Sequence, residues 1–182
     1  MTKALIVIAP GVEEMEAVIC ADVLRRAGVE TLLLGLEGEG AVEGSRGIVL
    51  GVDQAFSGEE NADLLVLPGG GEGAKRLAAD ERVRAMLQRF EKDGKWIAAI
   101  CAAPIALVAA GVGAGKTMTS HPSVQDTVEP FAGSYVEEAV AIDDHLVTGR
   151  GPGAAFDFAL DLVGLCVGPQ KAGEVRAPMM FS

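Results

Sequence analysis

Short apolar runs alternate along the chain with segments whose apolar residues recur at helical spacing. Residues 4–8, Leu64–Leu67 and Trp96–Ile100 are unbroken apolar runs of four or five residues, which predicts buried strands. Residues 13–27 and 81–93 instead place apolar residues three or four positions apart, which predicts helices that cover a sheet. Strands that are apolar on both sides and separated by helices favour a parallel sheet covered on both faces.

The weaker segments fit the same plan. They comprise predicted strands at residues 30–36, 48–52 and 116–119, a helix at 104–110, a hairpin at 135–148 that turns at Asp143 and Asp144, and a helix at 154–167. We therefore expect one α/β domain over residues 1–182, with a doubly wound, mainly parallel sheet of the flavodoxin-like, or Rossmann-like, type between two helical layers.

This fold predicts where a site should lie. Ligands of doubly wound sheets bind beyond the carboxyl ends of the strands, near the point where the winding direction changes. Three loops are expected to meet there: residues 10–16 after the first strand, the glycine-rich residues 68–73, and the turn that begins at Cys101.

Composition and charge exclude several classes of protein. The 182 residues carry a formal net charge of −11 and no Lys/Arg cluster longer than two, so phosphate backbones and anionic lipids would repel the chain. Residues 96–115 are uncharged and long enough to span a bilayer, but Pro104 and many Ala and Gly residues favour a buried strand followed by a buried helix. Three cysteines without a CxxC pair, and no secretory signal, predict a cytoplasmic protein.

Two glycine motifs fail as nucleotide sites. Residues 113–117 resemble the end of a P-loop, but Ala110 stands where that motif needs glycine. Residues 68–73 follow a strand but lack the spacing of a dinucleotide site, so their expected use is close approach of the backbone to a neighbour. The cysteines and histidines also lack metal-ligand spacing, and no metal or cofactor is expected.

Cys101 stands where a predicted strand ends and a predicted helix begins. The unpaired N–H groups of a helix N-terminus favour a thiolate, which is the nucleophilic form of cysteine. The ordinary alternative is that a cysteine in an apolar run is a small buried hydrophobe. Cys20 and Cys166 lie within helix-like apolar patterns and fit that alternative well.

Glu16 belongs to an acidic segment that opens the first predicted helix at the same sheet edge. Acidic residues are ordinary partners of a helix N-terminus. Helical spacing nevertheless turns Glu16 towards the apolar side that holds Ile19 and Cys20, where a carboxyl group is costly unless it is protonated or hydrogen-bonded. A protonated Glu16 can donate to the Cys101 sulfur, whereas an ionised one raises the pKa of the thiol.

Two histidines have different expected places. His121 follows the predicted strand at residues 116–119, which puts it near the same sheet edge, although a local turn contact is an equal alternative. His145 lies in the predicted hairpin turn and is expected at the surface.

Six segments together resemble the ThiJ/PfpI superfamily, in the branch of the Parkinsonism-associated protein deglycase. They are residues 4–11 (ALIVIAPG), 13–16 (EEME), 67–70 (LPGG), 98–102 (AAICA), 119–122 (TSHP) and 150–153 (RGPG). The resemblance implies a class I glutamine amidotransferase-like fold and a homodimer built around the first helix and the Arg46 region. By position, it assigns the site residues as follows: Cys101 as the reactive cysteine, Glu16 as its protonated carboxyl partner, His121 as the nearby histidine, Gly70 and Ala102 as backbone amide donors, and Arg46 as an interface arginine near the site.

The chain also departs from other branches of this superfamily. Ala102 follows the cysteine where the protease-like branch has histidine, so peptidase activity is not expected. Nothing matches the terminal His-x-Glu of the amidotransferases. Gly44 and Gly51 replace the accessory cysteines of human-like members, so redox chemistry of those thiols does not transfer.

The resemblance implies a cofactor-independent, glutathione-independent glyoxalase and protein deglycase that acts on methylglyoxal, glyoxal and early glycation adducts. Cys101 would add to the aldehyde carbon and Glu16 would move the protons, so the activity is that of a lyase or hydrolase. The alternative is an oxidative-stress sensor and redox-regulated chaperone in which Cys101 is oxidised to a sulfinate. Both need an accessible, reactive thiol, and the sequence leaves both open.

Overall fold

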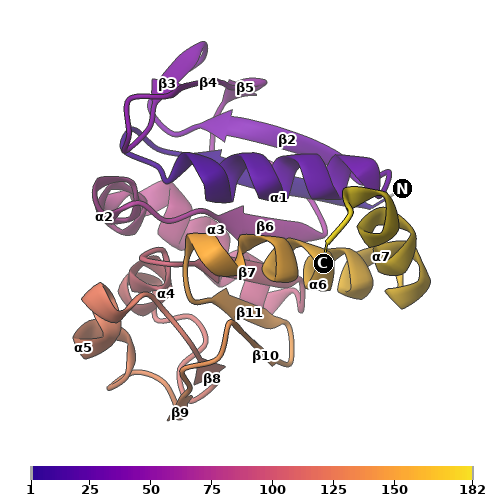
Figure 1. The fold of residues 1–182 in the computed structure, drawn as a ribbon. Helices are drawn as coiled ribbons and strands as arrows, with labels where there is room; N and C mark the ends of the chain where they lie inside the picture. Colours follow the sequence, from indigo (N-terminus) through magenta and orange to yellow (C-terminus); the bar gives the residue numbers. More distant parts are fainter. Residues whose placement is uncertain (1, 182) are drawn as a thin grey trace.

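A seven-stranded sheet forms the centre of the computed structural model, which describes residues 2–181 (Figure 1). Its strand order is β10-β11-β7-β6-β1-β2-β5, and every neighbouring pair is parallel except β10 with β11. The strands are β1 (Lys3–Ile8), β2 (Glu30–Gly35), β5 (Gln54–Ala55), β6 (Leu64–Leu67), β7 (Trp96–Ile100), β10 (Val140–Asp143) and β11 (Leu146–Gly149). The expected mainly parallel, flavodoxin-like sheet is confirmed.

Helices cover both faces of this sheet. They are α1 (Glu14–Arg26), α2 (Gly71–Ala79), α3 (Glu81–Lys92), α4 (Pro104–Ala110), α5 (Gln125–Val128), α6 (Ala155–Val167) and α7 (Pro169–Arg176). Alternate residues of β1 enter different cores: Ile6 packs with the buried residues of α1 and α6, whereas Val7 packs with those of α3 and α4. The unbroken apolar runs therefore reflect strands that are buried on both sides.

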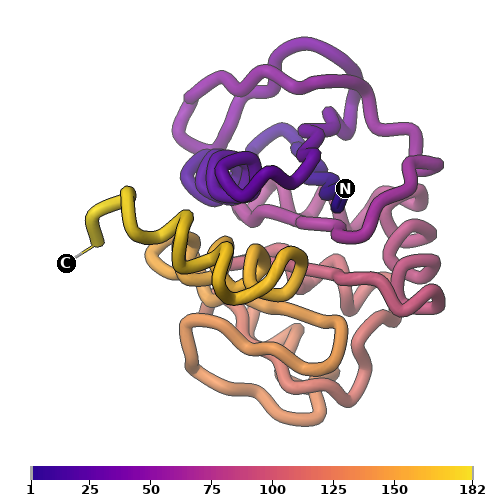
Figure 2. The backbone as a smooth tube through the Cα atoms, turned by 90° about the vertical axis from the view of Figure 1, so that its right-hand side faces the viewer, coloured from indigo at the N-terminus to yellow at the C-terminus, as the bar shows by residue number. Residues whose placement is uncertain are grey.

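The first helix and the C-terminal helices lie together on one face of the molecule. Helices α1 and α6 contact each other extensively, and α7 packs on α6 (Figure 1). In Figure 2 the yellow C-terminal segment lies beside the indigo first helix, and Arg26 of α1 lines a surface hollow together with Val175 of α7.

Two expected strands form but lie outside the main sheet. Strand β4 (Val49–Gly51) pairs antiparallel with β3 (Ala41–Glu43), and β8 (Thr117–Met118) pairs parallel with β9 (Ser134–Tyr135). Each is only two or three residues long and partly exposed, so neither carries the apolar surface that a central strand needs.

The other differences concern element boundaries. The expected hairpin is β10 with β11, turning at Asp144 and His145, and Tyr135 belongs to β9 instead. The sequence analysis missed α2 because its first residues, Gly71 to Gly73, have the composition of a loop, and it missed α7 because Pro169 looks like a stop. Proline in fact occupies the first turn of α7, where its missing N–H is not needed.

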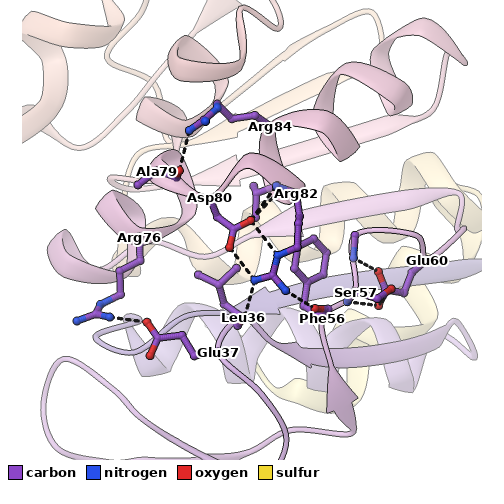
Figure 3. Close-up of polar contacts among 12 residues, drawn as sticks. Leu36, Glu37, Phe56, Ser57, Glu60, Arg76, Ala79, Asp80, Arg82 and Arg84 are labelled. Atoms are coloured by element: carbon purple, nitrogen blue, oxygen red, sulfur yellow. Dashed lines mark hydrogen bonds and ion pairs between the residues drawn. The ribbon is translucent and has the colours of Figure 1, made fainter.

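Arg82 ties α3 to the edge of the sheet (Figure 3). Its guanidinium donates to the carbonyl oxygens of Phe56 and Leu36, each at 2.8 Å. Asp80 caps α3 by accepting from the Arg82 amide at 2.8 Å, and its side chain also pairs with the Arg82 guanidinium at 2.7 Å. Burial opposes ionisation of Asp80, but the hydrogen bonds and charge of Arg82 outweigh it and hold the pKa of the carboxyl below its usual value.

We predict that Asp80→Ala lowers the free energy of unfolding by about 1–2 kcal/mol at pH 7, because it removes the cap and the partner of Arg82. Because the folded-state pKa of Asp80 is depressed, the charge-dependent part of this contribution is complete above the unfolded pKa of about 3.9 and is lost as the pH falls through the lower folded-state pKa. Urea unfolding of both proteins at pH 7 and pH 3.5 measures the effect. The control is Glu81→Ala, because the Glu81 side chain is 93% exposed. An equal destabilisation by Asp80→Ala at both pH values would contradict the prediction.

Candidate active site

Cys101 directly follows β7 and has a backbone conformation that non-glycine residues rarely adopt. Its φ is +64°, in the left-handed region. Two backbone hydrogen bonds hold it there: the Cys101 amide donates to the Gly149 carbonyl, and the His121 amide donates to the Cys101 carbonyl, each at 2.8 Å. The end of β11 and the loop after β8 thus hold the cysteine in a sharp strand-to-helix turn. A strained backbone of this kind persists only where the surrounding structure holds it.

The Cys101 side chain is nearly buried, with the residue 8% exposed. The backbone amides of Gly70 and Ala102 both form hydrogen bonds with its sulfur. The structure thus places the amides of Gly70 and Ala102 next to the Cys101 sulfur, and their role as donors in a reaction stays a prediction. Cys20 lies fully buried in α1, and Cys166 is half-buried in α6, as expected for core cysteines.

Glu16 points inward from the first turn of α1 and is fully buried. Its Oε2 accepts a hydrogen bond from the Gly69 amide at 2.7 Å. Its Oε1 is buried without a nitrogen or oxygen partner among the described residues, while the carboxyl group interacts directly with the Cys101 thiol. The helical spacing therefore places Glu16 as the sequence analysis expected.

Burial raises the pKa of Glu16 to about 7, although the hydrogen bonds from Gly69 and Cys101 act in the opposite direction. Burial also raises the pKa of the Cys101 thiol, and the negative charge of an ionised Glu16 adds to this effect. The amides of Gly70 and Ala102 lower it, but they do not outweigh burial. The backbone amides beside the sulfur thus favour a thiolate, and an ionised Glu16 opposes it, both as expected, but burial outweighs the amides.

The glycine loop after β6 leaves no room for side chains. A Cβ on Gly69 would lie 2.6 Å from Cys101 Cβ and 2.8 Å from Glu16 Oε2. Gly70 has a φ of +90°, and a Cβ there would lie 2.3 Å from the Gly11 carbonyl oxygen. The expected use of this loop, close backbone approach, is what the structure shows. The sequence analysis missed the role of the Gly69 amide, which no side-chain pattern could reveal.

His121 reaches Cys101 through its backbone. Its imidazole Nδ1 lies 2.8 Å from Ser123 Oγ and accepts from the Ser123 amide at 3.2 Å, which leaves Nε2 free for other partners. The local turn contact and the position near the sheet edge thus both occur. His145 is exposed, as expected, and stacks near Trp96.

Tyr135 steadies the segment that carries His121. Its hydroxyl donates to the Ser120 carbonyl at 3.1 Å and lies 3.0 Å from Ser120 Oγ. Ser120 itself is completely buried. The sequence offered no signal for this contact, since Tyr135 is separated from Ser120 by a short helix and a loop.

Arg46 does not join the other candidates within one chain. It is exposed on the β3–β4 hairpin, and its guanidinium contacts the neighbouring Ser45 carbonyl at 3.3 Å. The hairpin is held by buried Glu14, whose Oε1 accepts from the Arg46 amide at 2.7 Å. Burial opposes ionisation of Glu14, but the amides of Arg46 and Ile48 help to lower its pKa below the usual value.

In the part of the chain that the structure describes, one surface cavity lies at His121. A cavity of about 450 Å³ is lined by His121, Arg150 and the segment that precedes α6. A hollow of about 500 Å³ around Trp96 and Cys166 lies at the opposite, amino-terminal edge of the strands, so we do not assign it to the chemistry of Cys101.

Within residues 2–181, no three His, Cys, Asp or Glu side chains gather in a way that could hold a metal ion. In the same part of the chain, none of the helices combines the length and apolar character needed to cross a membrane.

Comparison with known proteins places this arrangement in a family. The model of the DJ-1/PfpI family matches residues 2–165. Protein dj-1beta of Drosophila melanogaster is 42% identical over 184 residues, covering 99% of this chain and 97% of that protein. The glutathione-independent glyoxalase DJR-1.2 of Caenorhabditis elegans is 35% identical and covers 99% of this chain and 97% of that protein.

Comparison of three-dimensional structures also places the chain with this family. The crystal structure of Drosophila melanogaster DJ-1beta superimposes with a TM-score of 0.96 at 40% identity, covering 100% of this chain and 98% of the other. The strained cysteine, the buried carboxyl and the glycine loop thus occur in a chain that belongs to the DJ-1/PfpI family.

Proposed function

We propose that this protein is a glutathione-independent glyoxalase that converts methylglyoxal and glyoxal to hydroxy acids. The observation that carries the proposal is the buried Glu16 carboxyl, with a pKa of about 7, in direct contact with Cys101. A general acid–base is most effective when its pKa lies near the working pH. The naming of a similar worm protein as a glutathione-independent glyoxalase supports the same activity.

The first step adds the sulfur to the substrate. Glu16 accepts the thiol proton while Cys101 Sγ forms a bond to the aldehyde carbon, and the electron pair of the carbonyl bond moves onto its oxygen. The amides of Gly70 and Ala102, which form hydrogen bonds with the sulfur, would donate to the negatively charged oxygen of the former carbonyl group. Glu16 then returns the proton to the oxygen, giving a hemithioacetal.

The second step moves a proton between adjacent carbons. Glu16 removes the proton from the carbon that bears sulfur, giving an enediolate, and delivers it to the neighbouring carbon. The hydroxyl proton on the sulfur-bearing carbon passes to the neighbouring oxygen, which leaves a hydroxy thioester on Cys101. Water adds to the thioester carbon, the carbon–sulfur bond breaks, and the sulfur regains a proton. The sum is one oxoaldehyde plus one water giving one hydroxy acid, and we propose that His121 assists through Nε2.

The same chemistry extends to early glycation adducts. These adducts are hemiaminals or hemithioacetals of the same dicarbonyls, so the carbon that Cys101 attacks is already present in them or is released when they dissociate. We therefore include protein deglycase action in the proposal, in the cytoplasm and without a cofactor.

The second candidate is an oxidative-stress sensor that works through the same cysteine. The amides of Gly70 and Ala102 around the sulfur favour it, because they would also bind the oxygen atoms of a Cys101 sulfinate. Turnover of methylglyoxal by metal-free protein without glutathione distinguishes the two. A rate no higher than that of a free thiol would reject the glyoxalase and leave the sensor.

We further propose a homodimer built on α1 and the β3–β4 hairpin. Four large apolar side chains are exposed there: Met15 at 56%, Val18 at 49%, Ile48 at 56% and Val49 at 61%. An apolar group of this kind on a soluble surface marks an interface. In such a dimer, Arg46 of the hairpin becomes an interface residue, as the family resemblance suggests.

The first prediction concerns Glu16→Gln. This variant keeps a hydrogen-bond donor but cannot transfer a proton, so methylglyoxal turnover should fall by about 10²-fold or more while Cys101 stays open to alkylation. Lactate formation measures turnover, and Glu81→Gln, at an exposed position, is the matched control. If Glu16→Gln turned over substrate at nearly the wild-type rate, the acid–base role would pass to His121.

The second prediction concerns pH and the three cysteines. Below about pH 7 both Cys101 and Glu16 hold their protons, so kcat/KM for methylglyoxal should fall as the pH drops through this region. Alkylation followed by mass spectrometry at pH 7.5 should modify Cys101 first, because the amides of Gly70 and Ala102 favour its thiolate and Glu16 lies beside it to accept the proton. Burial raises the thiol pKa of all three cysteines, but no amide donor offsets it at Cys20 or Cys166. Equal labelling of Cys20 and Cys101 would refute the assignment.

The third prediction concerns assembly. Light scattering at micromolar concentration should give twice the mass of the chain, and Val18→Glu should shift it towards one chain. Ile142→Glu is the control, because Ile142 is 46% exposed on β10, away from α1. A wild-type mass of one chain would refute the dimer.

A further inference from the structure

The cavity of about 450 Å³ at His121 is lined by one cationic side chain and by backbone segments that adjoin Cys101. Its lining residues are His121, Pro122, Ala139, Arg150, Gly151, Pro152, Gly153 and Ala154. Two backbone contacts join this wall to the reactive cysteine: His121 donates to the Cys101 carbonyl, and Gly149, which precedes Arg150, accepts from the Cys101 amide. A molecule in the cavity therefore contacts the segments that hold Cys101 in place, although Cys101 itself does not line the cavity.

The Arg150 guanidinium has few hydrogen-bond and ion-pair partners among residues 2–181. Its Nη1 is buried and has no hydrogen-bond partner within residues 2–181. Its Nη2 lies 3.7 Å from Glu137 Oε2, longer than a hydrogen bond, and the Glu137 side chain is 73% exposed. A guanidinium is always charged, and leaving one of its buried donors unpaired costs free energy. The wall thus lacks an acceptor for Arg150.

The rest of the lining suits a negative group. None of the lining residues is Asp or Glu. The lining ends at Ala154, the N-cap of α6, which makes no side-chain capping bond, so the positive end of a 13-residue helix adjoins the cavity. Gly153 leaves open space, since a Cβ there would meet nothing within 4 Å.

We infer that this cavity binds the carboxylate of an anionic substrate, with Arg150 as the residue that determines this specificity. The inference rests on the proposed function and names its substrate class: an α-oxoaldehyde that also carries a carboxylate. The carboxylate oxygens accept from Arg150, and the aldehyde carbon faces Cys101. Glu137 competes for the same guanidinium, so its loss strengthens binding.

The binding test does not need turnover. Iodoacetate and iodoacetamide have nearly the same shape, but only iodoacetate carries a carboxylate, so the ratio of their alkylation rates at Cys101 reports an anion site. We expect Arg150→Gln to lower this ratio about 5-fold to 10-fold, as for loss of a charge-assisted hydrogen bond, while Arg150→Lys retains part of it. Glu137→Gln should raise the ratio.

Arg26→Gln is the matched control. It removes one positive charge at the far end of α1, where Arg26 pairs with Asp22 at 2.8 Å, and should leave the ratio unchanged. A ratio that does not respond to Arg150→Gln, or responds equally to Arg26→Gln, would overturn the inference and leave water as the partner of Nη1. If Arg150→Gln fails to fold, Glu137→Gln decides, because an unchanged ratio there would equally overturn it.

The turnover test separates the two proposals. The wild-type kcat/KM for 4,5-dioxopentanoate, an α-oxoaldehyde with a carboxylate, should exceed that for methylglyoxal, and Arg150→Gln should reduce the excess about 5-fold or more. Absence of turnover of either compound, with an alkylation ratio that depends on Arg150, would reject the glyoxalase and keep the anion site. Turnover of both compounds with no effect of Arg150→Gln would reject the anion site and keep the glyoxalase.

Discussion

The rest of the site depends on a carboxyl group that has been taken out of water. Glu16 is completely buried, and one of its oxygens has a single amide donor, that of Gly69. An isolated charge in such a place is costly, so the group holds its proton up to about pH 7. Protonation couples Glu16 to the neighbouring thiol, since a charge on either one opposes a charge on the other.

That constraint explains the shape of the loops around it. The Gly69 amide can reach Glu16 only because the loop after β6 passes against Cys101, and a Cβ at Gly69 would overlap both side chains. The cysteine in turn needs a positive φ to turn its sulfur towards this loop, and bonds to Gly149 and from His121 hold that conformation. Segments that follow β6, β7 and β8, together with the end of β11, therefore hold the Glu16 and Cys101 side chains together at one edge of the sheet.

Much of the fold and part of the candidate site could be predicted from the sequence, and the signal differs from one element to another. Unbroken apolar runs revealed β1, β6 and β7 because both of their faces are buried, and helical spacing turned Glu16 inward. The short strands β4 and β8 were found but not their pairing, since two or three residues carry too little pattern to specify a partner. The Gly69 amide and the Tyr135 hydroxyl act on backbone atoms, which leave no mark in the sequence.

In the proposed mechanism, the same burial favours Glu16 as the base. Ala102 follows the cysteine, so no imidazole stands next to the sulfur in the chain, and His121 directs Nδ1 to Ser123. Glu16 is the titratable side chain that the structure places in direct contact with the Cys101 thiol. A carboxylate acting on a thiol is ordinarily a poor match, because their usual pKa values differ by about four units. Burial raises that of Glu16 to about 7, where a general acid–base is most effective, but it raises that of the Cys101 thiol as well. In the proposed mechanism, loss of the thiol proton to Glu16 therefore also needs the amides of Gly70 and Ala102, which favour the thiolate.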